Sequence, residues 1–161
     1  MTDDETTRVV VITGASSGIG RATAHRLATQ GARLVLAARS TDQLERARQE
    51  CVSRGAQEVA VVPTDVADGA AVTALLDEAL SSFGRVDGVV HAASVLAYGL
   101  FHDVPADVFD RILTTNIIGT ANVARSSLRA FDGPEAGSLV IVGSLLSKIA
   151  APYMSSYGTS K

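Results

Sequence analysis

The stretch VVVITGASSGIGRATAHRLATQG, residues 9–31, determines how the rest of the chain is interpreted. It begins with a run of β-branched residues, which is typical of a strand buried on both faces of a parallel sheet. Gly14, Gly18 and Gly20 follow in the spacing G-x-x-x-G-x-G, and a helical pattern then runs to Gly31. Glycines at these positions permit a tight turn and let a pyrophosphate approach the amides at the helix N-terminus. The stretch therefore predicts a dinucleotide-binding turn, with an ordinary glycine turn as the alternative.

The remainder of the chain continues the alternation of strand and helix. Short, almost wholly apolar runs predict strands at residues 8–13, 33–38, 58–62, 86–92 and 138–143. The segments between them predict helices at residues 18–30, 40–54, 68–83 and 105–131, of which the second begins with a capping box from Ser40 to Gln43. Parallel neighbours joined by helices imply one α/β domain over residues 1–161, with a doubly wound parallel sheet of the Rossmann type.

Composition excludes several classes of function. With 161 residues, 47% of them hydrophobic, the chain is long enough for one packed domain. A net charge of -3 gives no basic field for nucleic acid, and no apolar run approaches the roughly 18 residues of a membrane span. The start MTDDETT is acidic where a signal peptide would be basic, so a cytoplasmic protein is expected. The single cysteine, Cys51, and the histidines His25, His91 and His102 show no metal-ligand spacing, so no metal site is expected.

The cofactor type can be inferred from the end of the second predicted strand. In a dinucleotide-binding fold, an acidic residue about 20 positions after the glycine turn binds the ribose 2′-hydroxyl of NAD, and an arginine there accommodates a 2′-phosphate. Arg39 lies nineteen residues after Gly20 and has no acidic neighbour. This position favours NADP over NAD, with a solvated charge at the end of a strand as the alternative.

Two motifs give the chain a resemblance to the short-chain dehydrogenase/reductase family. TGASSGIG, residues 13–20, matches the family's glycine motif, and YGTSK, residues 157–161, matches its tyrosine–lysine motif. The resemblance covers the chain from Val9 onward, and the motifs stand in the family's order. It implies an NAD(P)-dependent oxidoreductase that transfers a hydride between a nicotinamide cofactor and a ketone or alcohol.

The resemblance also implies which residues bind the cofactor. After the third strand, Asp65 corresponds to the family's acidic residue that meets the adenine. After the fourth strand the family carries N-N-A-G where this chain has HAAS, so the turn is expected to survive while the bonding of His91 stays open. The expected set is Gly14, Ser16, Ser17, Gly18, Ile19, Gly20, Arg39, Asp65, Val66, His91, Ala92, Ala93, Tyr157 and Lys161.

Carbonyl reduction requires a proton donor, because hydride transfer leaves an alkoxide. By the resemblance, Tyr157 is that donor, and Lys161, four residues later on the same helical face, stabilises the phenolate and holds the nicotinamide ribose. Ser144, at the end of the fifth strand, would hydrogen-bond the substrate oxygen, and Asn116 corresponds to the family residue that orders a water beside the lysine. Taken singly, each residue also has an ordinary structural interpretation, such as a half-buried ring or a solvated charge.

The family is longer than this chain, with two more strands and a segment that covers the substrate. A native chain ending on Lys161 would place a carboxylate beside the positive charge that the tyrosine needs. A truncated form of a longer enzyme, inactive by itself, is therefore expected. Two other functions stay open: a dinucleotide-binding sensor or scaffold without turnover, and a fragment that only associates with other chains. The intact set of Ser144, Tyr157 and Lys161 favours the enzyme, since a sensor needs no proton donor.

The predicted helix at residues 105–131 carries more apolar residues than one sheet face would cover. One stripe consists of Phe109, Leu113, Ile117, Ala121, Ala124 and Leu128, and off this stripe lie Val108, Ile112, Ile118 and Val123. In the family the same helix of a second subunit commonly packs here, which predicts a homodimer or homotetramer, with a covering C-terminal segment as the alternative. The substrate is expected to be a small carbonyl or alcohol, and the apolar residues near Ser144 favour an apolar one.

Overall fold

The computed structural model describes residues 7–131 and 137–161, and the acidic start at residues 1–6 lies outside this part of the chain. The fold is built around a parallel sheet with the strand order β3-β2-β1-β4-β5. The strands are β1 (Val9–Thr13), β2 (Arg33–Ala38), β3 (Glu58–Pro63), β4 (Gly88–His91) and β5 (Ser138–Ile141). The predicted α/β class and doubly wound parallel sheet are confirmed, and the strand ends lie close to those that the apolar runs predict.

The strand order explains where a ligand can bind. The chain runs outward from β1 to β2 and β3, and it then returns to place β4 on the other side of β1. The winding therefore reverses between β1 and β4, and open α/β sheets bind ligands at the carboxyl ends of the strands where such a reversal occurs. Thr13 of β1 pairs with His91 of β4 at this end of the sheet. Both residues thus border the expected site.

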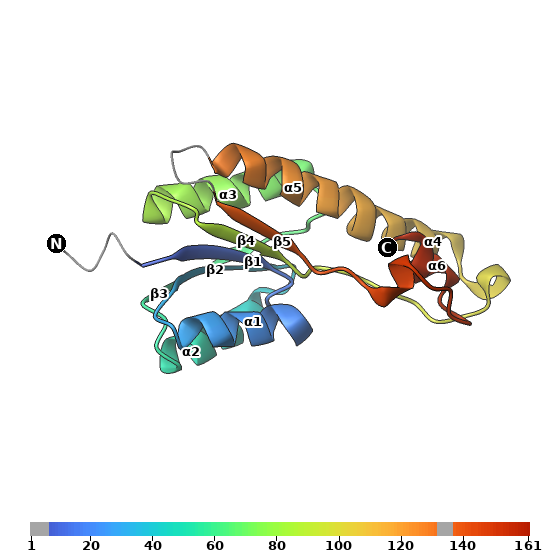
Figure 1. The fold of residues 1–161 in the computed structure, drawn as a ribbon, viewed down its shortest axis with the longest axis horizontal. Coiled ribbons are helices and arrows are strands. Elements are labelled where there is room, and N and C mark those ends of the chain that lie inside the picture. Colours follow the sequence, from blue (N-terminus) through green and yellow to red (C-terminus); the bar gives the residue numbers. More distant parts are fainter. Residues whose placement is uncertain (1–6, 132–136) are drawn as a thin grey trace.

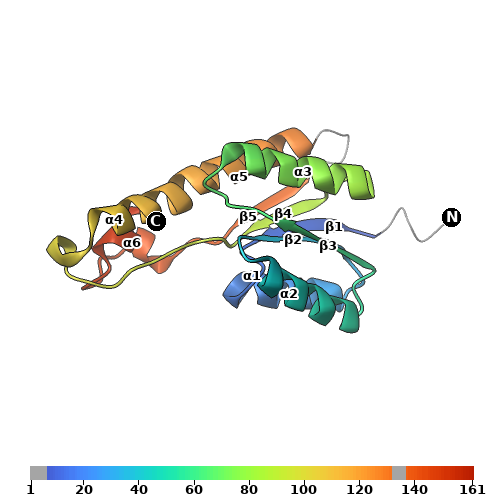
Figure 2. The same ribbon diagram turned by 180° about the vertical axis from the view of Figure 1, so that it is seen from behind.

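Helices cover both faces of the sheet. On one face lie α1 (Gly18–Ala28) and α2 (Thr41–Ser53), and on the other lie α3 (Gly69–Phe83) and α5 (Gly119–Ala130), as Figure 1 shows and Figure 2 repeats from behind. Alternate residues of the central strands pack into two separate apolar clusters, one beneath each pair of helices. This double burial is why the central strands are apolar without a break.

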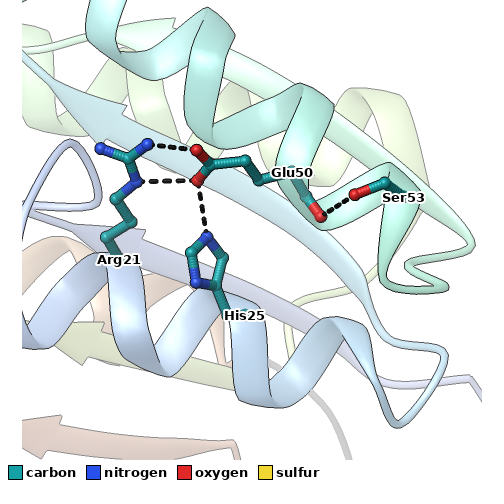
Figure 3. Close-up of polar contacts among 4 residues, drawn as sticks. All are labelled: Arg21, His25, Glu50 and Ser53. Atoms are coloured by element: carbon teal, nitrogen blue, oxygen red, sulfur yellow. Dashed lines mark hydrogen bonds and ion pairs between the residues drawn. The ribbon is translucent and has the colours of Figure 1, made fainter.

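A charged cluster joins the two helices of the first face. Arg21 and His25 of α1 both contact the Glu50 carboxylate of α2, and the distances from Arg21 Nε and His25 Nε2 to Glu50 Oε2 are 2.8 Å each (Figure 3). The hydrogen bonds from Arg21 are the main reason that the pKa of Glu50 falls to about 2. Since α1 begins at the glycine turn, the cluster fixes α2 to the helix that follows this turn.

The first turns of α2 and α3 are stabilised in different ways. Ser40 stands at the N-cap of α2, but its side chain makes no capping hydrogen bond, so the predicted capping box with Gln43 is wrong. At α3 the Asp68 carboxylate accepts hydrogen bonds from the amides of Ala70 and Ala71, at 2.8 and 3.2 Å. An acceptor at this position satisfies amide groups that a helix leaves unpaired at its start. Ser40 and Gln43 instead both line a pocket at the end of β2.

The helix predicted at residues 105–131 contains a π-helical turn. α4 (Ala106–Leu113) continues into the π-helix Thr114–Ile118 and then into α5, so the expectation of an uninterrupted α-helix is wrong. The π-turn precedes a close approach between α5 and the loop after β3, where a Cβ on Gly119 would lie 2.7 Å from Val66 Cγ2. Turns of this kind occur frequently at functional sites.

The face of this long helix that packs on the sheet is not its most apolar one. The buried face is of mixed polarity and consists of Ile112, Asn116, Gly119, Asn122, Val123, Ser126 and Ser127. The predicted apolar stripe lies partly on the outside, where Ile117 and Leu128 are 44% and 72% exposed. Ile118 is 51% exposed beside it. Apolar side chains therefore face away from the sheet in the described part of the chain.

A second group of elements lies beyond the carboxyl ends of the strands. There α4 lies beside α6 (Ser155–Thr159), and both extend past the edge of the sheet (Figures 1 and 2). Within residues 7–131 and 137–161, no helix combines the length and the apolar character that crossing a membrane requires.

Candidate active site

A pocket of about 230 Å³ opens at the carboxyl ends of the strands, where the winding of the sheet reverses. Its lining includes these residues predicted to bind the cofactor: Gly14, Ser16, Ser17, Arg39, Asp65, Val66, Ala92 and Ala93. The other predicted residues do not line it: Gly18, Ile19, Gly20, His91, Tyr157 and Lys161. The structure therefore brings together the loops after β1, β2, β3 and β4, as the sequence predicts.

Sequence reasoning missed several polar residues of the pocket wall. These are Ser40, Gln43, Thr64, Ser94 and Thr115. Ser40, Thr64 and Ser94 follow closely after the ends of β2, β3 and β4, so the rule that ligands meet the ends of parallel strands could have identified them. Thr115 lies in the π-helical turn and has no such local signal.

The three motif glycines have different physical roles. A Cβ on Gly14 would lie 2.7 Å from the amide nitrogen of Ala93, and a Cβ on Gly20 would lie 2.3 Å from the Gly14 carbonyl oxygen. Both positions exclude a side chain because backbone atoms already occupy the space. Gly18 has a φ angle of +52°, and no protein atom lies within 4 Å of an added Cβ. The space beside Gly18 is thus open at the point where a helix N-terminus can receive an anion.

Arg39 supplies positive charge at the edge of the pocket. Its side chain is exposed, and no carboxylate of the described residues forms an ion pair with it. Arg21, which follows the glycine turn, is instead occupied by Glu50. The acidic lining residue is Asp65, whose Oδ1 accepts a hydrogen bond from the amide of Ala67 at 3.0 Å. The end of β2 therefore presents a cation that is free to meet an anionic group.

His91 ends β4 and is 2% exposed. Its Nδ1 lies 2.7 Å from Thr13 Oγ1 on β1, and its Nε2 lies 3.0 Å from Thr120 Oγ1 on α5. Burial, with a smaller contribution from the charge of Lys161, lowers the pKa of His91 to about 4. The ring thus joins a strand to a helix, while the expected turn after it survives and lines the pocket through Ala92.

Asn116 lies in the π-helical turn, where it joins the pocket wall to the segment that carries Tyr157. Its Oδ1 accepts hydrogen bonds from the Val95 amide at 2.9 Å and the Ser94 hydroxyl at 3.1 Å. Its Nδ2 donates to the Val95 carbonyl and to Ser160 Oγ, both at 2.8 Å. Ser160 Oγ in turn donates to the Tyr157 carbonyl at 2.7 Å. The side chain of Asn116 has no hydrogen-bonding capacity left, so it is a structural link within the protein.

Tyr157 and Lys161 lie together at the end of the described chain. α6 includes the tyrosine, and Lys161 follows two residues after the last residue of this helix, Thr159. The Lys161 amide closes the following turn by donating to the Gly158 carbonyl at 3.2 Å. Lys161 Nζ lies 5.3 Å from the centroid of the Tyr157 ring, within the range of a cation–π contact. The ammonium group therefore lies near the phenol ring.

Ser144 follows β5 and caps the short 3₁₀ turn Leu145–Ser147. Its Oγ accepts a hydrogen bond from the Leu146 amide at 3.2 Å. The proton of this hydroxyl has no acceptor among the described residues, which leaves it able to donate to an external oxygen. No hydrogen bond within residues 7–131 and 137–161 joins Ser144 to Tyr157 directly, so its role toward a substrate stays a prediction.

Comparison with known proteins assigns the chain to a family. A family model for short chain dehydrogenases matches residues 8–161. The chain belongs to this family. It is 36% identical over 158 residues to dehydrogenase/reductase SDR family member 7B from Bos taurus, and 33% identical over 159 residues to SDR family member 7 from Homo sapiens. These matches cover 95% and 97% of this chain but 49% and 47% of the relatives, so the chain spans about half of their length.

Solved structures of the short-chain dehydrogenase fold agree with this assignment. A short chain dehydrogenase/reductase from Burkholderia phymatum in complex with NAD is 36% identical, with a TM-score of 0.91, and the match covers 96% of this chain and 55% of that one. An alcohol dehydrogenase from the archaeon Thermococcus sibiricus complexed with 5-hydroxy-NADP is 31% identical, with a TM-score of 0.89 and coverages of 96% and 65%. The similar structures thus include both cofactor types.

Replacing Gly18 by Ala tests whether the open space beside this residue receives a nicotinamide dinucleotide. Gly18→Ala should weaken NADPH binding by about tenfold or more, because the new methyl group occupies the space that the ligand needs. The left-handed backbone should also reduce the free energy of unfolding by about 1 kcal/mol. Fluorescence titration with NADPH and chemical denaturation measure the two effects.

Gly84→Ala is the matched control. Gly84 caps α3 with a φ angle of +73°, and it likewise has no protein atom within 4 Å of an added Cβ. A similar loss of stability with unchanged NADPH affinity is expected. Equal affinities for NADPH in the Gly18→Ala and Gly84→Ala proteins would show that the space beside Gly18 is not part of the binding site.

Proposed function

We propose that the protein is an NADP-dependent oxidoreductase that interconverts a ketone and an alcohol. The observation that carries this proposal is the contact of Lys161 with the Tyr157 ring. Hydrogen bonds through Ser160 and Asn116 link this pair to the wall of the pocket. A proton donor with an adjacent cation, connected to a pocket beside a glycine turn, suits carbonyl reduction and has no evident use in a binding protein without turnover.

The residues of the pocket fit a nicotinamide dinucleotide. Gly18 leaves room at the start of α1 for a pyrophosphate, and the Ser16 and Ser17 side chains lie in the loop that borders this space. Asp65 and Val66 form the wall after β3, where the adenine would lie in a family member, and Ala92 and Ala93 form the base after β4. A bound nicotinamide would supply the hydride in reduction and accept it in oxidation.

The chain's own residues would manage the proton and the developing negative charge. As a hydride reaches the carbonyl carbon, the oxygen becomes an alkoxide, and the Tyr157 hydroxyl would transfer its proton to this oxygen. The Lys161 ammonium would stabilise the resulting phenolate, and the Ser144 hydroxyl, whose proton is unused in the described residues, would donate a hydrogen bond to the same oxygen. In alcohol oxidation the same groups act in reverse, with the phenolate as base.

Removal of the Tyr157 hydroxyl tests the proposed chemistry in the whole protein. Tyr157→Phe should lower carbonyl reduction by about 100-fold or more, the usual contribution of a positioned general acid. Affinity for NADPH should change little, because the ring that contacts Lys161 is retained. Stopped-assay turnover against a panel of ketones, with NADPH titration as the control, measures both. Undiminished turnover would remove Tyr157 from the mechanism.

The preference for NADP rests on Arg39. Its guanidinium is exposed at the pocket edge where the 2′-substituent of the adenosine ribose would lie, and a planar guanidinium suits a phosphate. Ser40 and Gln43 beside it add polar groups that can accept or donate hydrogen bonds to the same phosphate. An acid that would select the ribose hydroxyl of NAD does not follow β2.

Reversing the charge at residue 39 tests this preference. Arg39→Asp should weaken NADPH binding by about 10- to 100-fold, as expected for the loss of charged hydrogen bonds, and should improve NADH binding. Arg46→Asp serves as the control, because Arg46 is also exposed on this side of the sheet, in α2, but does not line the pocket. Preference of the unaltered protein for NADH would contradict the role given to Arg39.

We further propose that the protein forms a homodimer or homotetramer through the outer face of the long helix. Ile117, Ile118 and Leu128 expose apolar surface there, and a two-fold axis would bury identical faces together. Val108 and Phe109 extend the same surface into α4 as half-buried residues. A surface of this kind in a soluble domain favours association over free exposure.

A charge on this face should separate the subunits. Ile118→Asp should convert the oligomer to a smaller species in light scattering at micromolar concentration. Ile112 is unsuitable for the test, because it is buried and a charge there would unfold the chain. Val52→Asp is the control, since Val52 is 50% exposed on α2 at the opposite face of the sheet. A monomeric unaltered protein at micromolar concentration would contradict the proposal.

A further inference from the structure

His91 occupies a junction of three elements. It ends β4, its Nδ1 meets Thr13 at the end of β1, and its Nε2 meets Thr120 on α5. His91 does not line the pocket, but two residues next to the junction do. Ala92 follows His91 directly, and Gly14 follows its partner Thr13. An imidazole has a nitrogen on each of two edges, so the ring can hydrogen-bond Thr13 through Nδ1 and Thr120 through Nε2.

The hydrogen-bond directions at this junction can be deduced. Thr120 Oγ1 lies 2.6 Å from the Asn116 carbonyl oxygen, and a carbonyl oxygen can only accept, so the Thr120 hydroxyl donates its single proton there. Thr120 Oγ1 must then accept from His91 Nε2, which therefore carries the proton. In a neutral ring Nδ1 is left as an acceptor, and the Thr13 hydroxyl donates to it.

We propose that His91 is a positioning residue that acts as the neutral Nε2–H tautomer, and that it aligns the glycine turn and the π-helical turn through a one-directional chain of hydrogen bonds. The chain runs from Thr13 to His91, then to Thr120, and ends on the Asn116 carbonyl. Its significance for cofactor binding rests on the proposed function, whereas the tautomer and the alignment do not.

The alignment reaches the candidate active site through Asn116. The carbonyl of Asn116 accepts the last hydrogen bond of the series that passes through His91. Its side chain hydrogen-bonds Val95 of the pocket wall and Ser160, the residue before Lys161. A shift of the π-helical turn would therefore move both the wall and the segment that carries Tyr157. The hydrogen bond between Thr13 and His91 affects the other side of the pocket, because Thr13 directly precedes Gly14 of the glycine turn.

The surroundings of the ring favour the neutral form. Its hydrogen-bond partners from β1 and from the long helix are two hydroxyls, neither of which titrates in this range, and the charged group that acts on it is Lys161. Burial first, and this positive charge second, lower the pKa of His91 from 6.5 to about 4. The unfolded chain therefore takes up a proton before the folded chain does, and stability falls as the pH decreases from about 6.5 toward 4.

The tautomer can be observed directly in the unaltered whole protein. Two-dimensional ¹H–¹⁵N spectra of the histidine rings should show a protonated Nε2 and an unprotonated Nδ1 for His91, with this pattern kept from pH 7.5 to pH 5.5. The signal is assigned by its absence from the His91→Asn protein, and the exposed His102 serves as the reference ring. A proton on Nδ1, or a charged ring within this pH range, would overturn the proposal.

Two substitutions of His91 test separately the hydrogen bonds to Thr13 and to Thr120. The amide of Asn reaches the place of Nδ1 but stops short of Thr120, whereas the amide of Gln reaches the place of Nε2. His91→Asn should therefore keep the contact with Thr13 and lose the one with Thr120, and His91→Gln should do the reverse. Thr120→Val removes the same link as His91→Asn, and Thr120→Ser restores the hydroxyl.

Amide hydrogen exchange provides a readout that needs neither substrate nor cofactor. His91→Asn and Thr120→Val should each speed exchange of the Val95 amide, which donates to Asn116, by about tenfold, while His91→Gln and Thr120→Ser leave it close to that of the unaltered protein. Equal exchange in all four proteins, or equal acceleration in His91→Asn and His91→Gln, would mean that His91 only fills space, and would overturn the proposal.

Titration with NADPH then tests the hydrogen bond between Thr13 and His91. His91→Gln should weaken NADPH binding by about three- to tenfold, more than Thr120→Val does, because it frees the residue beside the glycine turn. The reverse order of affinities would contradict the assigned directions. If the unaltered protein does not bind NADPH, the proposed function fails, while the ring spectra and the exchange of the Val95 amide still decide the role of His91.

Discussion

The close approach of the first turn to the end of β4 is the constraint on which the rest of the structure depends. The turn at Gly14 meets the backbone of Ala92 and Ala93, and Gly20 meets the carbonyl of Gly14, each at distances that admit no Cβ. The groups in the way are backbone atoms that directly follow the paired ends of β1 and β4, so they cannot move aside as a flexible side chain would. Glycine at both places lets β1, α1 and β4 meet directly, and the pocket at the strand ends opens beside this meeting point.

The polar groups behind this crevice are arranged to leave few of their hydrogen-bonding sites unused. Asn116 uses all four sites of its side chain, and His91 and Thr120 pass a fixed sequence of donors and acceptors between β1 and the π-helical turn. An apolar core of the same shape would tolerate small rotations of the long helix, because dispersion contacts have no direction. A fully paired polar network accepts one arrangement, so it specifies position even where its net stabilisation is small.

The sequence predicts most of the fold because each strand and helix leaves a local pattern. The strands β1 and β2 are buried on both faces and are apolar apart from Thr13 and Arg33, so their bounds follow closely from composition. The π-helical turn leaves no such pattern, because one residue more per turn hardly alters the spacing of apolar positions. Its most informative residue, Asn116, is polar on the buried face, and its partners Val95 and Ser160 are far away along the chain. The resemblance of motifs predicted the residue but not its contacts.

The long helix shows why its apolar stripe was not enough to orient it. With about 100° between successive residues, the stripe through Ile117 and Leu128 lies roughly a third of a turn from the line through the buried Ile112 and Val123. The packed face includes Asn116 and Asn122, whose side chains hydrogen-bond the backbone of Val95 after β4 and of Val66 after β3. These bonds therefore hold this face in place together with its apolar contacts. A helix that must both seal a core and align a polar network cannot use its most apolar side for the core. That side is left facing outward, where its burial requires something other than the sheet.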